Sequence, residues 1–258
     1  MGKIAMGIVF LFGLFNVMGQ DLSAYKKEVF VKGKDRMPYR ILLPDNYNPE
    51  ERYPLLLFLH GSGERGTDNE LQLVHGARLF LQEDVRKKFP AIVVFPQCPK
   101  EDQWSNKENT ADPTQGKFIF HKKGKPTMAM KMVQKLMKQL FKNYPVDRSK
   151  VYVGGLSMGG MGTFEIVRRN PKTFAAAFPI CGGAHPDTAG KLTGASWWVF
   201  HGDKDQAVPY TYSSAMVKAI EAAKGKVKYS LYPDVGHNSW DNAFAEPQLL
   251  PWLFSTRR

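Results

Sequence analysis

The sequence contains little cysteine, and this shortage excludes whole classes of protein. Only Cys98 and Cys181 occur among its 258 residues. Two cysteines are too few for a disulfide scaffold or a cysteine-based zinc cluster, although a single bridge stays open in an oxidising compartment. The chain also lacks internal repeats, low-complexity tracts and an evident linker. With 43% hydrophobic residues it can bury a large core, so one domain is expected.

Only the N-terminus resembles a targeting segment. Lys3 precedes an apolar stretch from Ile4 to Val17, and small or polar residues follow over 18–21. This pattern predicts a signal peptide over residues 1–20, a single domain over 21–258, and export to the periplasm or the extracellular space. The alternatives are a buried N-terminal helix or a membrane anchor, for which the stretch is short, since a span takes about 20 residues. No cysteine lies near the cleavage point, so no stable membrane association is expected.

Acidic residues are outnumbered, and the formal net charge is +12. Such a charge makes nucleic acid, anionic lipid and acidic polysaccharide partners worth considering. The basic residues are spread along the chain, however, and their densest cluster, Lys117 to Lys125, includes aromatic residues typical of a loop or hairpin. We therefore expect no nucleic-acid partner and interpret this cluster as a solvated surface, with docking of an anionic polymer as the alternative. The oligomeric state stays open.

Strands and helices alternate along the chain. Two early strands, Tyr25 to Val31 and Pro38 to Leu43, are expected to form a hairpin. Continuous apolar runs without alternation follow, as is typical of strands buried on both faces of a parallel sheet. They occupy 55–59, 91–95, 151–153 and 197–200, with 174–180 and 227–232 as companions. Helical patterns lie between them, over 71–87, 127–142, 161–169 and 210–224. The order predicts an α/β fold, with helices on both faces of a mostly parallel sheet.

One strand is followed by a turn suited to a nucleophile. The sequence Gly155-Leu156-Ser157-Met158-Gly159 directly follows the run 151–153 and precedes a helical pattern. A serine on such a sharp turn needs small residues two positions before and after it, so that strand and helix can approach. The G-x-S-x-G pattern alone is a weak signal, but its place between strand and helix makes Ser157 the predicted nucleophile. The alternative is a glycine-rich helix entry without chemistry.

A nucleophilic serine needs a base, and the base needs a carboxylate to orient it. When the serine lies on a turn of this kind, the acid and then the base follow it in the chain. Of the later histidines, His237 follows the run 227–232 and is the predicted base, while His185 and His201 are expected to be structural. Asp203 and Asp205 both follow the run 197–200, and spacing favours Asp205 only modestly.

An oxyanion hole requires backbone N–H groups aimed at the developing charge. The amide of Met158, at the start of a helix, is one predicted donor. The loop after 55–59 reads His60-Gly61-Ser62-Gly63-Glu64-Arg65-Gly66, and the amide of Ser62 or Gly63 is the predicted second donor. An ordinary glycine-rich turn and a phosphate cradle are the alternatives, but a cradle would need a following Lys-Ser/Thr.

These motifs carry a family resemblance. The strings LFLHGSGERG, GGLSMGGMGTF, HGDKDQAVP and GHNSW resemble bacterial α/β-hydrolase esterases of the carboxylesterase and phospholipase-like group, which is similar to feruloyl and acetylxylan carbohydrate esterases. The resemblance spans the chain from about Tyr25 onward. It implies a three-layer α/β-hydrolase fold with about eight strands, Asp205 as the acid and His237 as the base, in agreement with the choice made from the residues.

A serine nucleophile indicates acyl transfer through an acyl-enzyme, and this chemistry needs no cofactor and no metal. We therefore expect a carboxylic-ester hydrolase, with acetyl or feruloyl groups on plant polysaccharide as candidate substrates. The alternatives are a lipid or thioester hydrolase and a non-catalytic glycan-binding module on a hydrolase fold. About fifteen residues separate the runs 174–180 and 197–200, so no large cap is expected.

Two further predictions concern the position of Trp104 and the oxidation state of the cysteines. Trp104 lies in the long stretch 97–125 and is expected either to line the substrate site or to anchor that stretch by packing. Cys98 and Cys181 follow strands that we expect to be separated by two others, or about 14 Å at strand spacing. Free thiols are therefore expected.

Overall fold

The computed structural model describes residues 21–112 and 116–258. Their main feature is a sheet of eight strands in the order β1-β2-β4-β3-β7-β8-β9-β10. The pairs from β4 to β10 are all parallel, whereas β2 runs antiparallel to both β1 and β4. The predicted α/β fold with a mostly parallel sheet is confirmed. The sheet strands are β1 Lys26–Lys32, β2 Asp35–Leu42, β3 Tyr53–Leu59, β4 Ile92–Pro96, β7 Val146–Leu156, β8 Ala176–Ile180, β9 Ser196–Gly202 and β10 Lys226–Tyr232.

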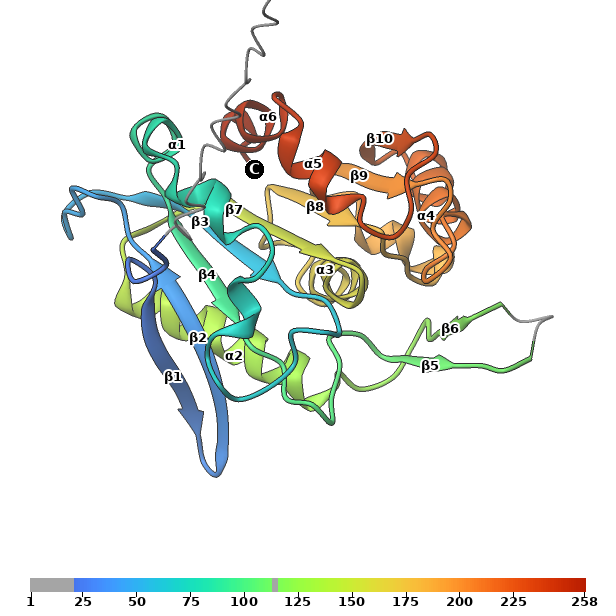
Figure 1. The fold of residues 1–258 in the computed structure, drawn as a ribbon, viewed down its shortest axis with the longest axis horizontal. Helices are drawn as coiled ribbons and strands as arrows, with labels where there is room; N and C mark the ends of the chain where they lie inside the picture. The colour runs from blue at the N-terminus through green and yellow to red at the C-terminus, as the bar shows by residue number, and fades with distance from the viewer. Residues whose placement is uncertain (1–20, 113–115) are drawn as a thin grey trace, which may run out of the picture.

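Helices cover both faces of this sheet. Figure 1 shows α1 and α6 on one side of it and α2 and α3 on the other. The two faces correspond to two separate clusters of buried side chains, one including residues of α2, α3 and α4 and the other residues of α1, α5 and α6. The helices are α1 Glu83–Lys88, α2 Met128–Asn143, α3 Met158–Arg169, α4 Thr211–Ala222, α5 Trp240–Ala245 and α6 Leu249–Ser255, with short 3-10 segments η1 Leu71–Leu73, η2 Ala77–Leu81 and η4 Pro186–Lys191.

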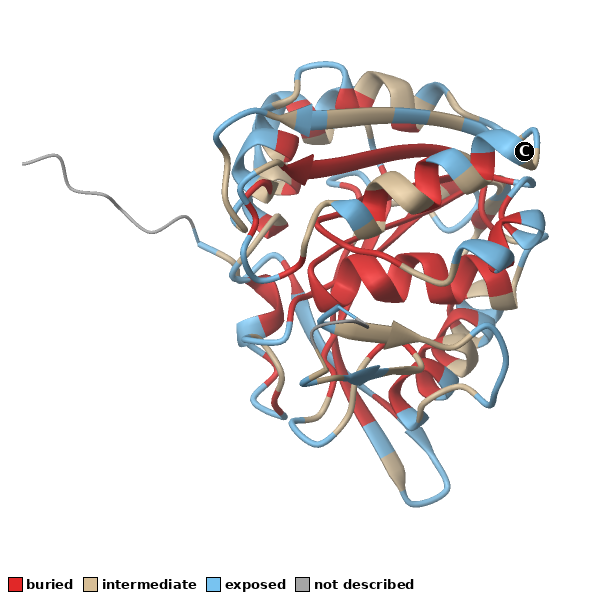
Figure 2. Cartoon of the chain, turned by 90° about the vertical axis from the view of Figure 1, so that its right-hand side faces the viewer, coloured by how far each residue is buried: buried red, intermediate tan, exposed pale blue. Residues whose placement is uncertain are grey.

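The central strands are apolar because both of their faces are covered. Every residue of β4 and β8 is buried, and β3 has a single partly exposed position. Figure 2 shows the buried residues concentrated in the inner strands and helices, with most exposed residues in the peripheral loops and strands. Burial of apolar side chains on this scale is the main stabilising contribution to such a fold.

The prediction of one helix over 71–87 is wrong. The segment instead forms two 3-10 turns and a short helix, α1. Gly76 lies between the two turns with a φ of 81°, in the left-handed region, and a left-handed residue interrupts a right-handed helix. The apolar spacing is therefore satisfied by separate turns whose buried residues face the same core.

The long stretch after β4 contains a second, two-stranded sheet. It pairs β5 Lys107–Asn109 with β6 Phe118–Phe120 in antiparallel register. This hairpin projects from the main body beyond α3 (Figure 1). Between β8 and β9 the chain forms only η4, in agreement with the expectation of no large cap.

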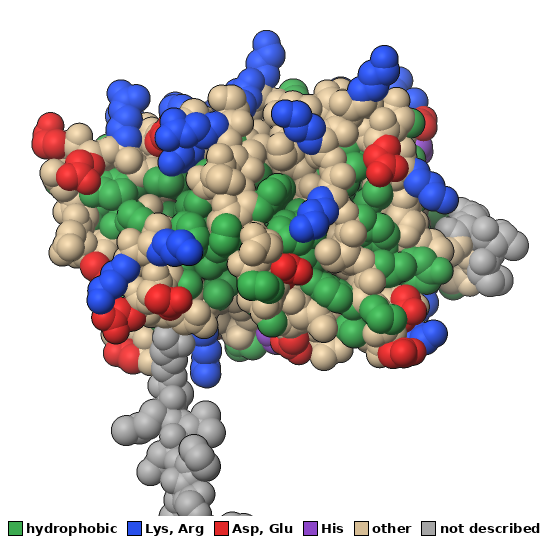
Figure 3. Space-filling model, turned by 90° about the horizontal axis from the view of Figure 1, so that it is seen from above, with side chains coloured by type: hydrophobic (Ala, Val, Ile, Leu, Met, Phe, Trp, Pro, Cys, Tyr) green, Lys and Arg blue, Asp and Glu red, His purple; other side chains and the backbone are tan. Residues whose placement is uncertain are grey.

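The sequence also led to expectations about surface charge, membrane association, the N-terminus and the two cysteines. Lys and Arg side chains are interspersed with Asp and Glu on the face shown in Figure 3. None of the helices in 21–112 and 116–258 is long and apolar enough to cross a membrane. The predicted signal peptide, residues 1–20, lies outside the described residues. Cys98 and Cys181 are both buried free thiols, as expected, and β3 and β7 lie between the strands that they follow.

Candidate active site

Ser157 lies on a strained turn between β7 and α3. Its φ of 53° and ψ of −116° are unusual for a residue with a side chain, and such strain concentrates at functional sites. The turn is held by its backbone, because the Ser157 N–H donates to the Ile180 carbonyl at 2.9 Å. Ser157 is buried, with 9% of its surface exposed, and it lines a cleft.

The two glycines that flank the turn are required by close packing. A Cβ at Gly159 would lie 1.8 Å from the backbone oxygen of Leu59, and one at Gly155 would lie 2.4 Å from that of Gly159. No side chain fits at such distances without a backbone shift. The strand, the turn and α3 approach one another this closely only because both positions are glycine.

A hydrogen-bonded chain connects Ser157 to a histidine and an aspartate. The Nε2 atom of His237 lies 3.0 Å from Ser157 Oγ, and its Nδ1 atom lies 2.7 Å from Asp205 Oδ2. The three residues come from the ends of β7, β9 and β10, which are separated in sequence but meet at one edge of the sheet. The structure therefore brings together the three residues predicted to form the triad.

Asp205 is fixed in place and kept ionised. Its Oδ1 atom accepts the N–H groups of Ala207 and Val208 at 2.8 and 2.9 Å. Burial by itself raises the pKa of this carboxyl, but hydrogen bonds from His201, His237 and a backbone N–H outweigh burial and hold the pKa well below its usual range. An ionised carboxylate at this position orients the imidazole and stabilises its protonated form.

Asp203, the other candidate acid, hydrogen-bonds to the loop before His237 instead of to its imidazole. Its Oδ1 atom accepts the backbone N–H of Asp234 at 2.8 Å, in the loop that leads to His237. It therefore supports the histidine loop and makes no hydrogen bond to the imidazole. The geometry distinguishes the two aspartates, which spacing in the sequence could not.

His201, which was expected to be structural, lies next to the acid, Asp205. Its fully buried ring places Nε2 3.2 Å from Asp205 Oδ2 and 2.8 Å from the Val208 carbonyl. Because both contacts are acceptors, Nε2 carries a hydrogen. The Nδ1 atom lies 2.7 Å from Ser213 Oγ, which in turn donates to the Gly182 carbonyl. The spacing His-Gly-x-x-Asp is the sequence signal for this contact.

The loop after β3 is anchored at its start by His60. The Cys98 N–H donates to His60 Nε2 at 2.9 Å, so Nδ1 carries the hydrogen and donates to the Gly61 carbonyl at 2.6 Å. Burial lowers the pKa of His60 to about 4. A neutral, fixed imidazole thus holds the strand end from which the predicted oxyanion loop starts.

Trp104 anchors the same loop and does not line the cleft. Its side chain is fully buried, and the indole N–H donates to the His60 carbonyl at 3.0 Å. The tentative assignment of Trp104 to substrate binding is therefore corrected in favour of the packing alternative. The aromatic residue that does reach the cleft is Phe118, which comes from the hairpin.

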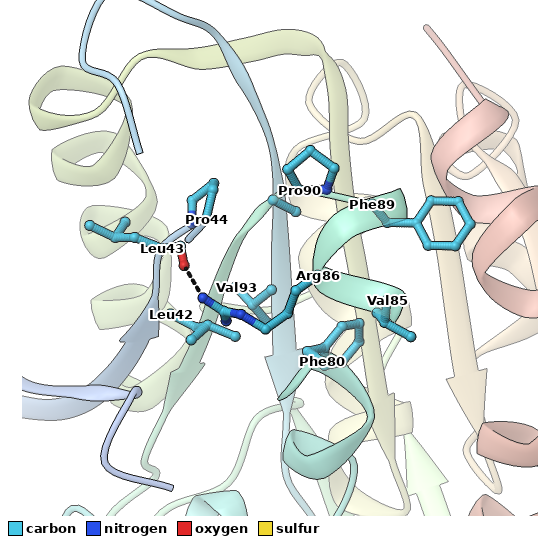
Figure 4. Close-up of a pocket in the computed structure, with 10 residues that line it drawn as sticks. Leu42, Leu43, Pro44, Phe80, Val85, Arg86, Phe89, Pro90 and Val93 are labelled. Atoms are coloured by element: carbon cyan, nitrogen blue, oxygen red, sulfur yellow. Dashed lines mark hydrogen bonds between the residues drawn. The ribbon is translucent and has the colours of Figure 1, made fainter. Parts of the chain in front are cut away.

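The cleft above Ser157 has a volume of about 250 Å³. Both Ser62 and Met158 line it, which places two of the three predicted oxyanion residues beside the nucleophile, whereas Gly63 is not among the lining residues. The apolar part of the wall is formed by Phe118, Met158, Met161 and Val208. A second cavity, between β2 and α1, has a volume of about 10 Å³, which is room for about one water molecule. Arg86 lines it and donates to the Leu43 carbonyl (Figure 4).

One group of side chains has the spacing of a metal site. Ligand atoms of Cys181, Asp205 and His237 lie within 4.8 Å of one another. Burial raises the pKa of the Cys181 thiol, so it stays protonated, and the other two groups already share a hydrogen bond. A proton between acid and base explains this arrangement better than a metal ion.

Comparison with known proteins places the chain in a family. Residues 32–253 match the family model named Esterase, described as "Putative esterase". The chain belongs to the Esterase family. Together with the fold, this membership identifies it as a carboxylesterase-type hydrolase. Over 241 residues, this esterase is 23% identical to a protein named "Probable feruloyl esterase C" from Aspergillus flavus, covering 92% of this chain and 82% of that protein.

Solved structures share the architecture. A structure described as a thermostable esterase is 33% identical to this esterase with a TM-score of 0.82; the match covers 92% of this chain, which spans 64% of that longer protein. A feruloyl esterase module from Clostridium thermocellum, complexed with sinapinate, is 17% identical with a TM-score of 0.64, covering 92% and 90% of the two chains. The similarity to the Clostridium thermocellum module shows only that the two proteins share a fold.

Proposed function

We propose that this esterase hydrolyses carboxylic esters through Ser157, with His237 as general base and Asp205 as the orienting carboxylate. The observation that carries the proposal is the continuous chain from Ser157 Oγ to His237 Nε2 at 3.0 Å and from His237 Nδ1 to Asp205 at 2.7 Å. A base in this position can take the serine proton as the oxygen attacks. A non-catalytic module would have no need of such an arrangement on a strained turn.

The reaction proceeds in two halves. The Ser157 oxygen attacks the ester carbonyl carbon while its proton moves to His237, and the backbone N–H of Met158 together with one from Ser62 or Gly63 stabilises the oxyanion. The ester C–O bond then breaks, and His237 gives the proton to the leaving alcohol. Water repeats the sequence on the acyl-enzyme, releasing the acid and restoring the serine.

The substrates that we propose are feruloyl or acetyl esters of plant polysaccharide. Support comes from the feruloyl esterase relative, from the partly aromatic and apolar wall of the cleft, and from the short connection between β8 and β9, which leaves space for a bulky alcohol. Export by the predicted signal peptide 1–20 would bring the enzyme to such a polymer.

A fluorophosphonate probe tests the nucleophile. It should label the wild-type protein and leave Ser157→Ala unlabelled, because only an activated serine reacts. Hydrolysis of 4-nitrophenyl acetate should fall by about 10⁴-fold or more in Ser157→Ala and in His237→Ala. Equal labelling of wild type and Ser157→Ala would exclude Ser157 as the nucleophile. Rates on methyl ferulate and on a long-chain ester would then separate a feruloyl esterase from a lipid esterase.

A further inference from the structure

The cleft that contains Ser157 also contains two cationic side chains that neither attack the substrate nor transfer a proton in the proposed reaction. Arg65, from the loop after β3, and Lys107, the first residue of β5, both line it. They reach the cleft from segments 42 positions apart in the chain. Charge of one sign in a concave site attracts ligands of the opposite sign and focuses the field on them.

Lys107 is held in the cleft without a negative partner. Its Nζ atom donates to Asn109 Oδ1 at 2.7 Å and lies 4.5 Å from the centre of the Phe118 ring. The described residues include every Asp and Glu of the chain, and their ion pairs involve neither Lys107 nor Arg65. Burial and the nearby charge of Arg65 lower the pKa of Lys107. An anion bound in the cleft would favour the charged ammonium group and so oppose both effects.

Arg65 is positioned by backbone oxygens. Its Nε donates to the Ser62 carbonyl at 3.0 Å, and its Nη1 donates to the carbonyls of Lys100 and Asp102 at 2.8 and 3.4 Å. Across the described part of the chain, its Nη2 has no hydrogen-bond partner. The guanidinium is therefore oriented before any ligand binds, which reduces the entropy lost when a carboxylate is bound.

We propose that this cleft selects esters that carry a second, anionic group, a carboxylate, which Arg65 and Lys107 bind while Ser157 attacks the ester carbonyl. The inference rests on the proposed function, the hydrolysis of esters at Ser157, and adds a charge requirement on either the acyl or the alcohol side of the substrate. The carboxylate lies either on the acyl side, as in the monoester of a dicarboxylic acid, or on the alcohol side, as in an ester of a uronic acid. Arginine and lysine in a partly desolvated cleft bind a carboxylate more strongly than they would at an open surface.

Matched substrate pairs test the proposal and distinguish the two sources. On the acyl side, the mono-4-nitrophenyl ester of adipic acid is compared with the same compound whose free carboxyl is a primary amide. On the alcohol side, 3-carboxyphenyl acetate is compared with 3-carbamoylphenyl acetate. Each pair differs by one charge at nearly constant size. We expect kcat/KM to favour the anionic member of one pair by about tenfold, with the preference decreasing as salt is added.

Lys107→Gln is the informative variant, because Gln can still hydrogen-bond to Asn109. It should reduce the anionic preference to less than about threefold. Lys123→Gln makes the same charge change at an exposed lysine that does not line the cleft, and it should leave the preference as in wild type. Arg65 is unsuitable for this test, since it also holds the Ser62 carbonyl of the predicted oxyanion loop.

The outcomes separate the two proposals. If the neutral esters are hydrolysed in a Ser157-dependent manner but neither anionic member is preferred, the anionic substrate class is refuted and the esterase mechanism stands. The same conclusion follows if Lys107→Gln and Lys123→Gln reduce the preference equally, because a general field would then explain it. If none of the four esters is hydrolysed, or if Ser157→Ala hydrolyses them as well as wild type, the proposed function fails first.

Discussion

Mild acid should destabilise this esterase through one buried histidine, His60. Its ring is 2% exposed, and its Nε2 atom accepts the Cys98 N–H, so protonation there would break a buried hydrogen bond. Burial lowers the pKa of His60 from 6.5 to about 4. The nearest carboxylate oxygen, Oε2 of Glu64, lies 4.0 Å from Nδ1, which instead donates to the Gly61 carbonyl. The folded protein therefore keeps this imidazole neutral.

The sign and size of the effect follow from linkage between protonation and folding. Because the pKa is lower in the folded state, the unfolded chain binds the proton first as the pH falls. The stability contributed by neutral His60 is thus complete above about pH 6.5 and is lost as the pH falls toward 4. Each pH unit within this window corresponds to about 1.4 kcal/mol, so the free energy of unfolding should fall by about 2 kcal/mol between pH 7 and pH 5.

Urea unfolding followed by tryptophan fluorescence at pH 7, 6 and 5 measures this change. The control is His60→Gln, which retains an acceptor for the Cys98 N–H but does not titrate. It should be less stable than wild type at pH 7 and should lose much less stability on acidification. Carboxylates that titrate near the end of this range affect both proteins alike. Parallel losses in wild type and variant would refute the assignment of this window to His60.

Three further predictions concern the turn and the acid. Gly159→Ala should destabilise the fold by about 3 kcal/mol or more, because its Cβ would lie 1.8 Å from a carbonyl oxygen of β3. The control is Gly190→Ala, whose Cβ would have no atom within 4 Å and which should shift the melting temperature little. Asp205→Asn should lower kcat on 4-nitrophenyl acetate by about 10²-fold to 10⁴-fold, and a larger loss in Asp203→Asn would overturn the choice of acid. His201→Asn should lower kcat about tenfold with KM unchanged, since it disturbs the acid without contacting substrate, and an increase in KM alone would count against that role.

Much of the fold could be predicted from the sequence because the signals are local. The continuous apolar runs of β3, β4, β7 and β9 indicate strands covered on both faces, and the structure confirms them. The segment 71–87 shows the limit of this reasoning. Its apolar spacing predicted a helix, but the tertiary structure satisfies that spacing with short turns around Gly76.

The sequence by itself determined the nucleophile turn. A serine between two glycines, after a buried strand and before a helix, specifies its own backbone geometry, since the steric requirement acts on adjacent residues. Only the tertiary structure decided which neighbours complete the site. The choice of Asp205 over Asp203, the contact of His201 with the acid, and the burial of Trp104 all depend on how separate loops fold back at the sheet edge. Such directions are set by packing between segments distant in the chain, which no local pattern encodes.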